Sequence, residues 1–235
     1  MYHYGMFYDP TYMLVIIGMI ITLIASANVK GTFAKYDKVL SRRGLTGADA
    51  ARKILDANGL FNVRIEHISG NLSDHFDPRN MVIRLSDATY NSSSVAAIGV
   101  AAHECGHAVQ HQVGYVPIKI RNGIVPFVNV CNYASIPLII LGLIMGSRGY
   151  NLAMLGVILF CAVLAFQIIT LPTETNASAR ALKTLEGMNM LDTDELRGAK
   201  KVLTAAAMTY FAGVASTALQ VLRLFLIVQN SRRRD

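Results

Sequence analysis

Residues 101–110 contain the pattern His-Glu-x-x-His, at His103, Glu104 and His107. In a helix, residues four apart share a face and lie about one turn apart. The two histidines can therefore bind one metal ion in the tetrahedral geometry of zinc. Glu104 follows the first histidine directly and can reach the water that zinc activates, where it would act as a general base in amide hydrolysis. The uncharged neighbours indicate a buried helix, which argues against a chance match.

A third zinc ligand is expected from another part of the chain, because His111 is too far away. In a regular helix, His111 lies on the face of His103 and His107 but about 12 Å along the axis from His103. A metal–nitrogen bond of about 2 Å cannot bridge that distance. We therefore expect His111 to lie at a helix end or in a cleft, and the third ligand to be a carboxylate further along the chain.

The composition is that of a membrane protein. Of 235 residues, 53% are hydrophobic, and four long apolar tracts are rare in a soluble domain of this length. The tracts cover residues 13–27, 124–145, 152–170 and 202–228. The basic residues behind the net charge of +7 concentrate beside these tracts, so we expect a lipid bilayer and no nucleic acid as partner. The three cysteines form no CxxC pair, and no disulfide framework is expected.

The charges that flank the first tract predict the topology. Residues 30–43 hold five lysines and arginines, whereas residues 1–12 hold none. This bias places the N-terminus outside and the following segment in the cytoplasm. The arginines at 232–234 would then end outside, against the same rule, unless the last tract fails to cross. Both arrangements stay open.

The best candidate for the third ligand is Glu174, which follows the third tract. A short link at residues 146–150 joins the second and third tracts, so this hairpin must return the chain to the side that it left. Glu174 then lies on the same side of the membrane as His103 and His107. It would complete a site of two histidines and one carboxylate with an open position for water. The alternative is a glutamate at a helix N-terminus, which the helix dipole favours.

The segment between the first two tracts has the pattern of a folded polar domain. Thr46 can cap a helix that ends at the Asn-Gly pair 58–59. Residues 62–68 and 81–85 alternate between polar and apolar, as half-buried strands do. The second strand either pairs with an extended substrate at the sheet edge or only supports the motif helix. The serines at 92–94 can cap that helix.

A polar cluster of Asp74, His75 and Asp77 lies in the turn-rich run 69–80. These residue types could form a second metal site. Turns commonly use Asp and Asn to bond their own backbone, which favours a turn over a metal site.

Five short motifs carry a resemblance to known families. They are Leu-Thr-Gly-Ala at 45–48, Ala-Asn-Gly-Leu at 57–60, Ser-Asp-His-Phe-Asp-Pro-Arg at 73–79, Ala-His-Glu-Cys-Gly-His-Ala-Val-Gln at 102–110 and Leu-Pro-Thr-Glu at 171–174. Over nearly its whole length, the chain resembles the YugP-like membrane zinc metallopeptidases and, more distantly, the HtpX-like and CAAX-processing membrane proteases. The resemblance implies zinc at His103, His107 and Glu174, with Glu104 as the catalytic base, and a hairpin of membrane spans between the motif and the third ligand.

The chain departs from these families at two positions. Ser178 stands four residues after Glu174, where the HtpX-like enzymes carry Asp. Asn176 stands two residues after Glu174, where YugP-like chains often carry Asp. A carboxylate at such a position would orient a metal-bound histidine. The residues that orient His103 and His107 are therefore left open.

We expect a mainly α-helical membrane protein of about four transmembrane helices, with a small α+β zincin-like catalytic domain in the cytoplasm. The expected segments are residues 1–28 (tail and first transmembrane helix), 29–122 (zincin-like region with the motif helix), 123–171 (transmembrane hairpin), 172–201 (cytoplasmic segment with the third ligand) and 202–235 (last transmembrane helix and basic tail).

The expected function is that of a gluzincin-type, Zn2+-dependent endopeptidase of the cell membrane, which hydrolyses protein or peptide substrates at or near the bilayer. The alternative is a membrane scaffold or adaptor that keeps zinc for structure. Glu104 argues against the scaffold, because a structural site has no use for a base. The sequence predicts neither the substrate nor the oligomeric state, and the candidates for stabilising the oxyanion are His75, His111 and Tyr115.

Overall fold

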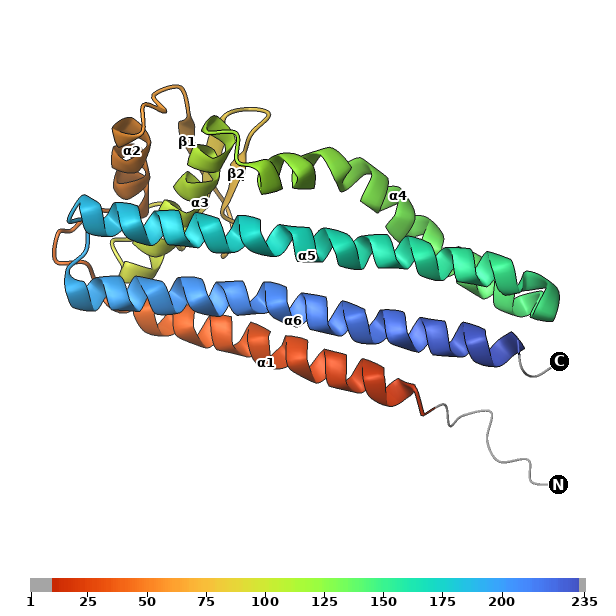
Figure 1. Ribbon diagram of the computed structural model, residues 1–235. Helices are drawn as coiled ribbons and strands as arrows, with labels where there is room; N and C mark the ends of the chain where they lie inside the picture. Colours follow the sequence, from red (N-terminus) through yellow and green to blue (C-terminus); the bar gives the residue numbers. More distant parts are fainter. Residues whose placement is uncertain (1–9, 233–235) are drawn as a thin grey trace. The chain divides into compact units, whose positions relative to one another are not determined.

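The computed structural model describes residues 10–232, and the fold is mainly helical (Figure 1). By length and composition, four of its helices can cross a membrane, namely α1, α4, α5 and α6. These four helices contain the four apolar tracts of the sequence. In chain order, the elements of the described part are α1 (Tyr12–Tyr36), α2 (Gly47–Ala57), β1 (Arg64–Ile68), β2 (His75–Asp77), β3 (Val82–Ser86), α3 (Val95–Gln112), α4 (Val116–Ile144), the 3-10 turn η1 (Gly146–Gly149), α5 (Tyr150–Gly187) and α6 (Thr193–Arg232).

The chain forms two compact units. One comprises Ser26–Ile120 and Thr170–Thr209, and it contains the sheet together with α2 and α3. The other comprises Met1–Ala25, Arg121–Ile169 and Tyr210–Asp235. Residues 1–9 and 233–235, with most of the N-terminal tail and two of the terminal arginines, lie outside the described part. Helices α1, α4, α5 and α6 each contribute residues to both units, and each is longer than the apolar tract that predicted it.

Small residues allow close helix packing in the unit that holds most of the apolar tracts. A Cβ atom at Gly18 of α1 would lie 2.8 Å from the hydroxyl oxygen of Ser216 in α6. A Cβ atom at Gly142 of α4 would lie 2.7 Å from the Cβ atom of Ala153 in α5, and the short link η1 joins these two helices as expected. Contacts of this kind let membrane helices pack closely through their backbones.

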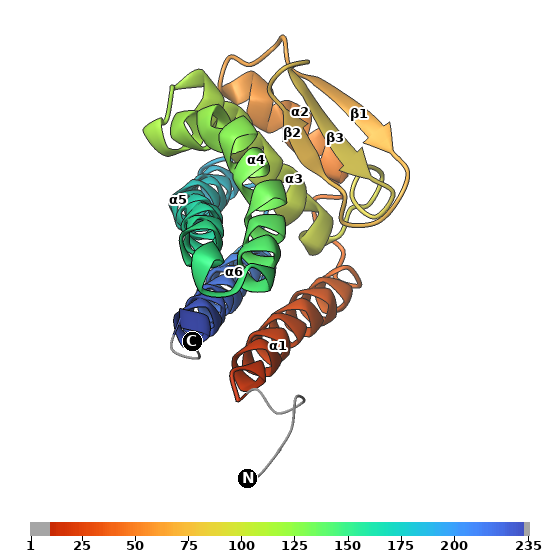
Figure 2. The same cartoon turned by 90° about the vertical axis from the view of Figure 1, so that its right-hand side faces the viewer.

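The three strands form one sheet in the order β1-β3-β2, with α2 and α3 beside it (Figure 2). β1 pairs parallel with β3, and β2 pairs antiparallel with β3. β1 and β3 lie where the alternating pattern predicts strands. β2 lies in the run expected to form turns. The sequence does not predict this strand, because three residues are too few to show an alternating pattern. The interpretation of the second predicted strand as an edge for substrate pairing is wrong, since β3 is paired on both sides.

Local sequence sets the ends of α2 and α3. Thr46 and Asp49 form a reciprocal capping box at the start of α2. Gly59 follows its end with φ +70°, a left-handed conformation that glycine adopts without strain. At the start of α3, the Ser94 hydroxyl accepts a hydrogen bond of 3.1 Å from the Ala97 N–H. Both helices therefore begin at the caps that the sequence predicts.

α5 runs without a break from Tyr150 to Gly187, although Pro172 lies inside it. A proline removes one helix hydrogen bond, and packed neighbouring helices can tolerate the loss. The third apolar tract and the segment that carries Glu174 are therefore one helix. The alternative interpretation of Glu174 as a residue at a helix N-terminus is wrong. In the same way, the last apolar tract and the polar residues before it form the single helix α6.

Candidate zinc site

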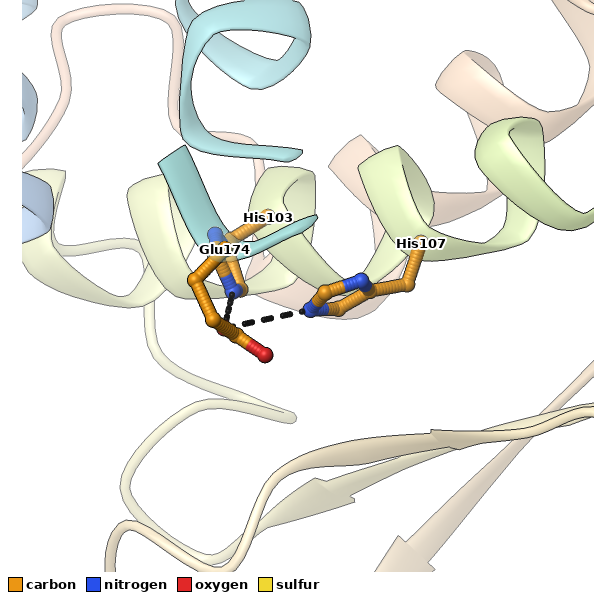
Figure 3. Close-up of side chains that lie close together, drawn as sticks. All are labelled: His103, His107 and Glu174. Atoms are coloured by element: carbon orange, nitrogen blue, oxygen red, sulfur yellow. Dashed lines mark ion pairs between the residues drawn. The ribbon is translucent and has the colours of Figure 1, made fainter. Parts of the chain in front are cut away.

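His103 and His107 of α3 face Glu174 of α5 (Figure 3). The Oε2 atom of Glu174 lies 3.4 Å from His103 Nε2 and 3.5 Å from His107 Nε2. The two imidazole rings stand edge to face with their centroids 4.7 Å apart, as residues one helical turn apart can. All three residues belong to the same compact unit, and Glu174 is only 3% exposed.

These distances fit a tetrahedral metal site better than direct hydrogen bonds. Zinc bonds of about 2.0 to 2.2 Å at a tetrahedral angle separate neighbouring ligand atoms by about 3.4 Å. A charge-assisted N–H···O hydrogen bond is shorter, at about 2.8 Å. Two imidazole nitrogens and one carboxylate oxygen are also a known ligand set of catalytic zinc. Within residues 10–232, this trio is the group of histidine, cysteine and acidic side chains whose ligand atoms all lie within 4.8 Å of one another.

Buried negative charge favours a cation at this place. Burial by itself would lower the pKa of His107, but contact with Glu174 and the nearby charge of Glu104 outweigh burial and raise that pKa. Burial also raises the pKa of Glu104, whose residue is 8% exposed. A divalent cation held by the trio would compensate both carboxylates.

Neutral side chains orient the two histidines. His103 Nδ1 lies 3.1 Å from the Ser178 hydroxyl oxygen, and His107 Nδ1 lies 3.0 Å from Gln110 Oε1. When each Nδ1–H donates to these oxygens, the Nε2 lone pair of each ring faces Glu174. Such partners fix the tautomer and the ring orientation of histidines that bind metals. At Ser178, where the HtpX-like enzymes carry Asp, a hydroxyl group therefore takes the place of an orienting carboxylate.

Gln110 links His107 to α5. Its side chain is fully buried, and its Nε2 donates to the Thr173 carbonyl oxygen at 2.8 Å and to Asn176 Oδ1 at 3.0 Å. The same Asn176 oxygen accepts a 2.8 Å hydrogen bond from Arg180 Nε. Asn176 thus contacts Gln110, and Gln110 in turn contacts His107. Reasoning from the sequence missed Gln110, although its position three residues after His107 on α3 was the available signal.

Glu104 is held by the backbone of β2. Its Oε2 atom accepts a hydrogen bond of 2.9 Å from the Phe76 N–H. That N–H therefore points away from β3, so Phe76 and Ile83 form a pair without hydrogen bonds in the antiparallel ladder. Within the described residues, the other carboxylate oxygen of Glu104 makes no hydrogen bond. One oxygen is thus fixed and the second remains available for chemistry.

The polar cluster around β2 anchors this strand. Both carboxylate oxygens of Asp74 accept hydrogen bonds from Ser86, one from its N–H at 2.8 Å and one from its hydroxyl at 2.9 Å. Asp77 accepts from Arg84 Nη1 at 2.9 Å and from Asn80 Nδ2 at 2.8 Å. The aspartates therefore hold the turn and the sheet, and Asp77 accepts hydrogen bonds from the Arg79 and Asn80 N–H groups of its own turn, as the turn interpretation predicts.

The match to known proteins covers most of the chain. Residues 11–229 match the family described as "Putative neutral zinc metallopeptidase". The chain belongs to this family. A relative from Bacillus subtilis (strain 168), named "Putative membrane protease YugP", is 44% identical over 208 residues, or 88% of this chain and 92% of the relative. No solved structure matches the chain significantly.

Membership of this family confirms the resemblance drawn from the sequence motifs and gives Zn2+ as the metal. With its four apolar helices and its match to this relative, the chain is a multi-pass membrane protein. Two other residues near the motif lie apart from the trio. His111 is exposed, and its ring lies edge-on to Phe76 with centroids 5.9 Å apart. Cys105 donates its thiol to the Ala51 carbonyl oxygen, and burial raises the pKa of that thiol.

Proposed function

We propose that the chain is a gluzincin-type zinc endopeptidase, with His103, His107 and Glu174 as the zinc ligands and Glu104 as the general base. The observation that carries the proposal is the approach of Glu174 Oε2 to within 3.5 Å of both histidine Nε2 atoms. Three protein ligands leave a fourth position for water and substrate, as catalytic zinc sites require. Structural zinc sites use four protein ligands, which speaks against the scaffold alternative.

Zinc at these ligands would lower the pKa of water toward about 7 and polarise the scissile carbonyl. The chain's own contribution centres on Glu104. Because Oε2 is held by the Phe76 N–H, we propose that Oε1 accepts the proton of the attacking water. Glu104 then delivers this proton to the leaving amine nitrogen and returns to its carboxylate form. Ser178 and Gln110 keep the histidine rings in place throughout.

The substrates that we propose are proteins or peptides in the membrane or close to it. Four apolar helices support this proposal, as does the name of the relative, "Putative membrane protease YugP". The segment boundaries that we propose are those expected from the sequence: 1–28, 29–122, 123–171, 172–201 and 202–235.

We also propose that the site faces the cytoplasm, because the basic run 30–43 follows the first span. A cysteine placed at Lys53, which is exposed in the unit that contains the site, tests this orientation. A membrane-impermeant thiol reagent added to intact cells should leave this cysteine unlabelled. Labelling from outside would reverse the proposed topology.

The test of the function is cleavage of a peptide library by the purified full-length chain, read by mass spectrometry, together with the zinc content of the same sample. We expect Glu104→Gln to keep its zinc and to lose cleavage by a factor of about 100 or more. Glu186→Gln, a matched change at an exposed position of α5, should cleave like the wild type. Equal cleavage by Glu104→Gln, or loss of zinc from a folded Glu104→Gln, would contradict the assigned role.

A further inference from the structure

A cavity of about 490 Å3 lies between the C-terminal end of α1 and the N-terminal part of α6, in the same compact unit as the zinc site. Figure 1 shows these two helix ends next to each other. Four basic side chains line the cavity: Lys35 from α1, and Arg197, Lys200 and Lys201 from α6. Residues more than 160 positions apart in the sequence thus place their positive charges at one cavity.

The charge of the cavity is not neutralised by the protein. No acidic residue lines it. Arg197 pairs with Asp194 of its own helix turn. Within the described part of the chain, no carboxylate forms an ion pair with the three lysines. The cavity therefore keeps an excess of three positive charges and attracts an anion.

Close packing beside the cavity keeps the two helix ends together. A Cβ atom at Gly198 of α6 would lie 2.8 Å from the ring of Tyr36 in α1. Phe33 of α1 packs in a buried cluster with Val202 of α6 and with Ala96 of α3. The backbones that carry the basic residues are therefore fixed before any ligand binds, which lowers the cost of binding.

The cavity lies where the apolar tracts begin and end. In α1, its lining starts at Asn28, directly after the tract 13–27, and in α6 it reaches Met208, inside the tract 202–228. Ala205 and Met208 give it an apolar wall, whereas the lysine ammonium groups and the hydroxyls of Thr32 and Thr204 give it polar groups. This combination matches a molecule with a negatively charged head and an apolar body at the membrane surface.

We propose that this cavity binds one anionic phospholipid, with its phosphate at Lys35, Lys200 and Lys201 and the start of its apolar body against Ala205 and Met208. The tendency of basic residues to flank membrane spans on the cytoplasmic side does not account for the arrangement by itself. Lys30 and Lys38 satisfy that tendency equally well, yet they do not line the cavity. The proposal goes beyond the proteolytic site and does not depend on zinc.

The experiment is native mass spectrometry of the full-length chain in detergent, with equal amounts of phosphatidylglycerol and phosphatidylcholine. We expect the wild type to retain phosphatidylglycerol preferentially. Each basic residue near an anionic lipid contributes about fivefold to binding, so the variant K35Q/K200Q/K201Q should lose on the order of 100-fold of this preference at low salt. The control variant K30Q/K38Q/K53Q removes the same charge outside the cavity and should behave like the wild type.

A second variant fills the cavity without a change of charge. Thr204 is exposed and lines the cavity, so Thr204→Trp should also lose the lipid while zinc content stays unchanged. Equal retention of both lipids by the wild type, or equal losses in the cavity and control variants, would overturn the proposal. So would displacement of the lipid by inorganic phosphate at a stoichiometric amount, since that result would assign the cavity to a free anion.

Discussion

Gly106 of α3 lies against the backbone of Ala177 in α5. A Cβ atom at Gly106 would lie 2.6 Å from the Ala177 carbonyl oxygen, and Ala177 is fully buried. The two helix backbones therefore touch one residue before His107 and three residues after Glu174. This contact sets the distance between the helix that carries the histidines and the helix that carries the carboxylate.

Replacement of Gly106 by valine should push the two helices apart and weaken zinc binding. Forcing extra atoms into a packed contact costs about 1 to 3 kcal/mol, so we expect a lower free energy of unfolding and a zinc Kd raised at least about tenfold. Thermal unfolding in detergent and chelator competition measure the two effects. Gly31→Val in α1, where a Cβ meets no atom within 4 Å, is the control. Unchanged zinc affinity in Gly106→Val would show that this contact does not set the site.

Gln110→Leu should lower zinc affinity through His107 without touching the metal. The change leaves His107 Nδ1 and the Thr173 carbonyl without their partner. Loss of a residue that orients a metal ligand typically costs about 10- to 100-fold in metal affinity. The control is Gln112→Leu, since Gln112 is exposed and donates only to the Asn58 carbonyl oxygen. If both variants bind zinc equally well, His107 does not depend on Gln110.

Asp74→Ala should reduce kcat by about tenfold or more and leave zinc content unchanged, as expected when a group that positions a general base is lost. Asp74 fixes β2 to Ser86, and β2 in turn holds Glu104 through the Phe76 N–H. Steady-state kinetics on a peptide found by the library screen, with metal analysis of the same protein, separate the two effects. Asp56→Ala removes an exposed aspartate on α2 that pairs with Arg52 and should leave kcat unchanged. A wild-type kcat in Asp74→Ala would exclude the anchoring role.

The residues that face one another in the site could be predicted from the sequence, because helical spacing and the return of a short membrane hairpin are simple geometric constraints. A spacing of four residues puts His103 and His107 on one helical face whatever the rest of the fold does. The short link between two spans returns the chain to one side, which brings Glu174 within reach in broad terms. The continuity of α5 through Pro172 could not be predicted from the sequence, because packing around a helix decides whether a proline ends that helix.

The supporting contacts could not be predicted, because they depend on distances between elements. Ser178 of α5 reaches His103 of α3 because the two helices touch at Gly106, and the same contact brings Gln110 to the Thr173 carbonyl oxygen. β2 is three residues long, with the sequence His-Phe-Asp, so its strand character comes from pairing with β3 and not from an apolar pattern. The bond from the Phe76 N–H to Glu104 follows from that pairing and is equally hidden in the sequence.

The most direct test of the proposed site is the zinc content of Glu174→Ala beside that of His111→Ala, measured on purified full-length protein by elemental mass spectrometry. Glu174 lies 3.4 and 3.5 Å from the two histidines, whereas His111 is exposed and packs against Phe76. We predict that Glu174→Ala loses tightly bound zinc while His111→Ala keeps the wild-type amount. Retention of zinc in Glu174→Ala, with its loss in a folded His111→Ala, would contradict the assignment of the third ligand.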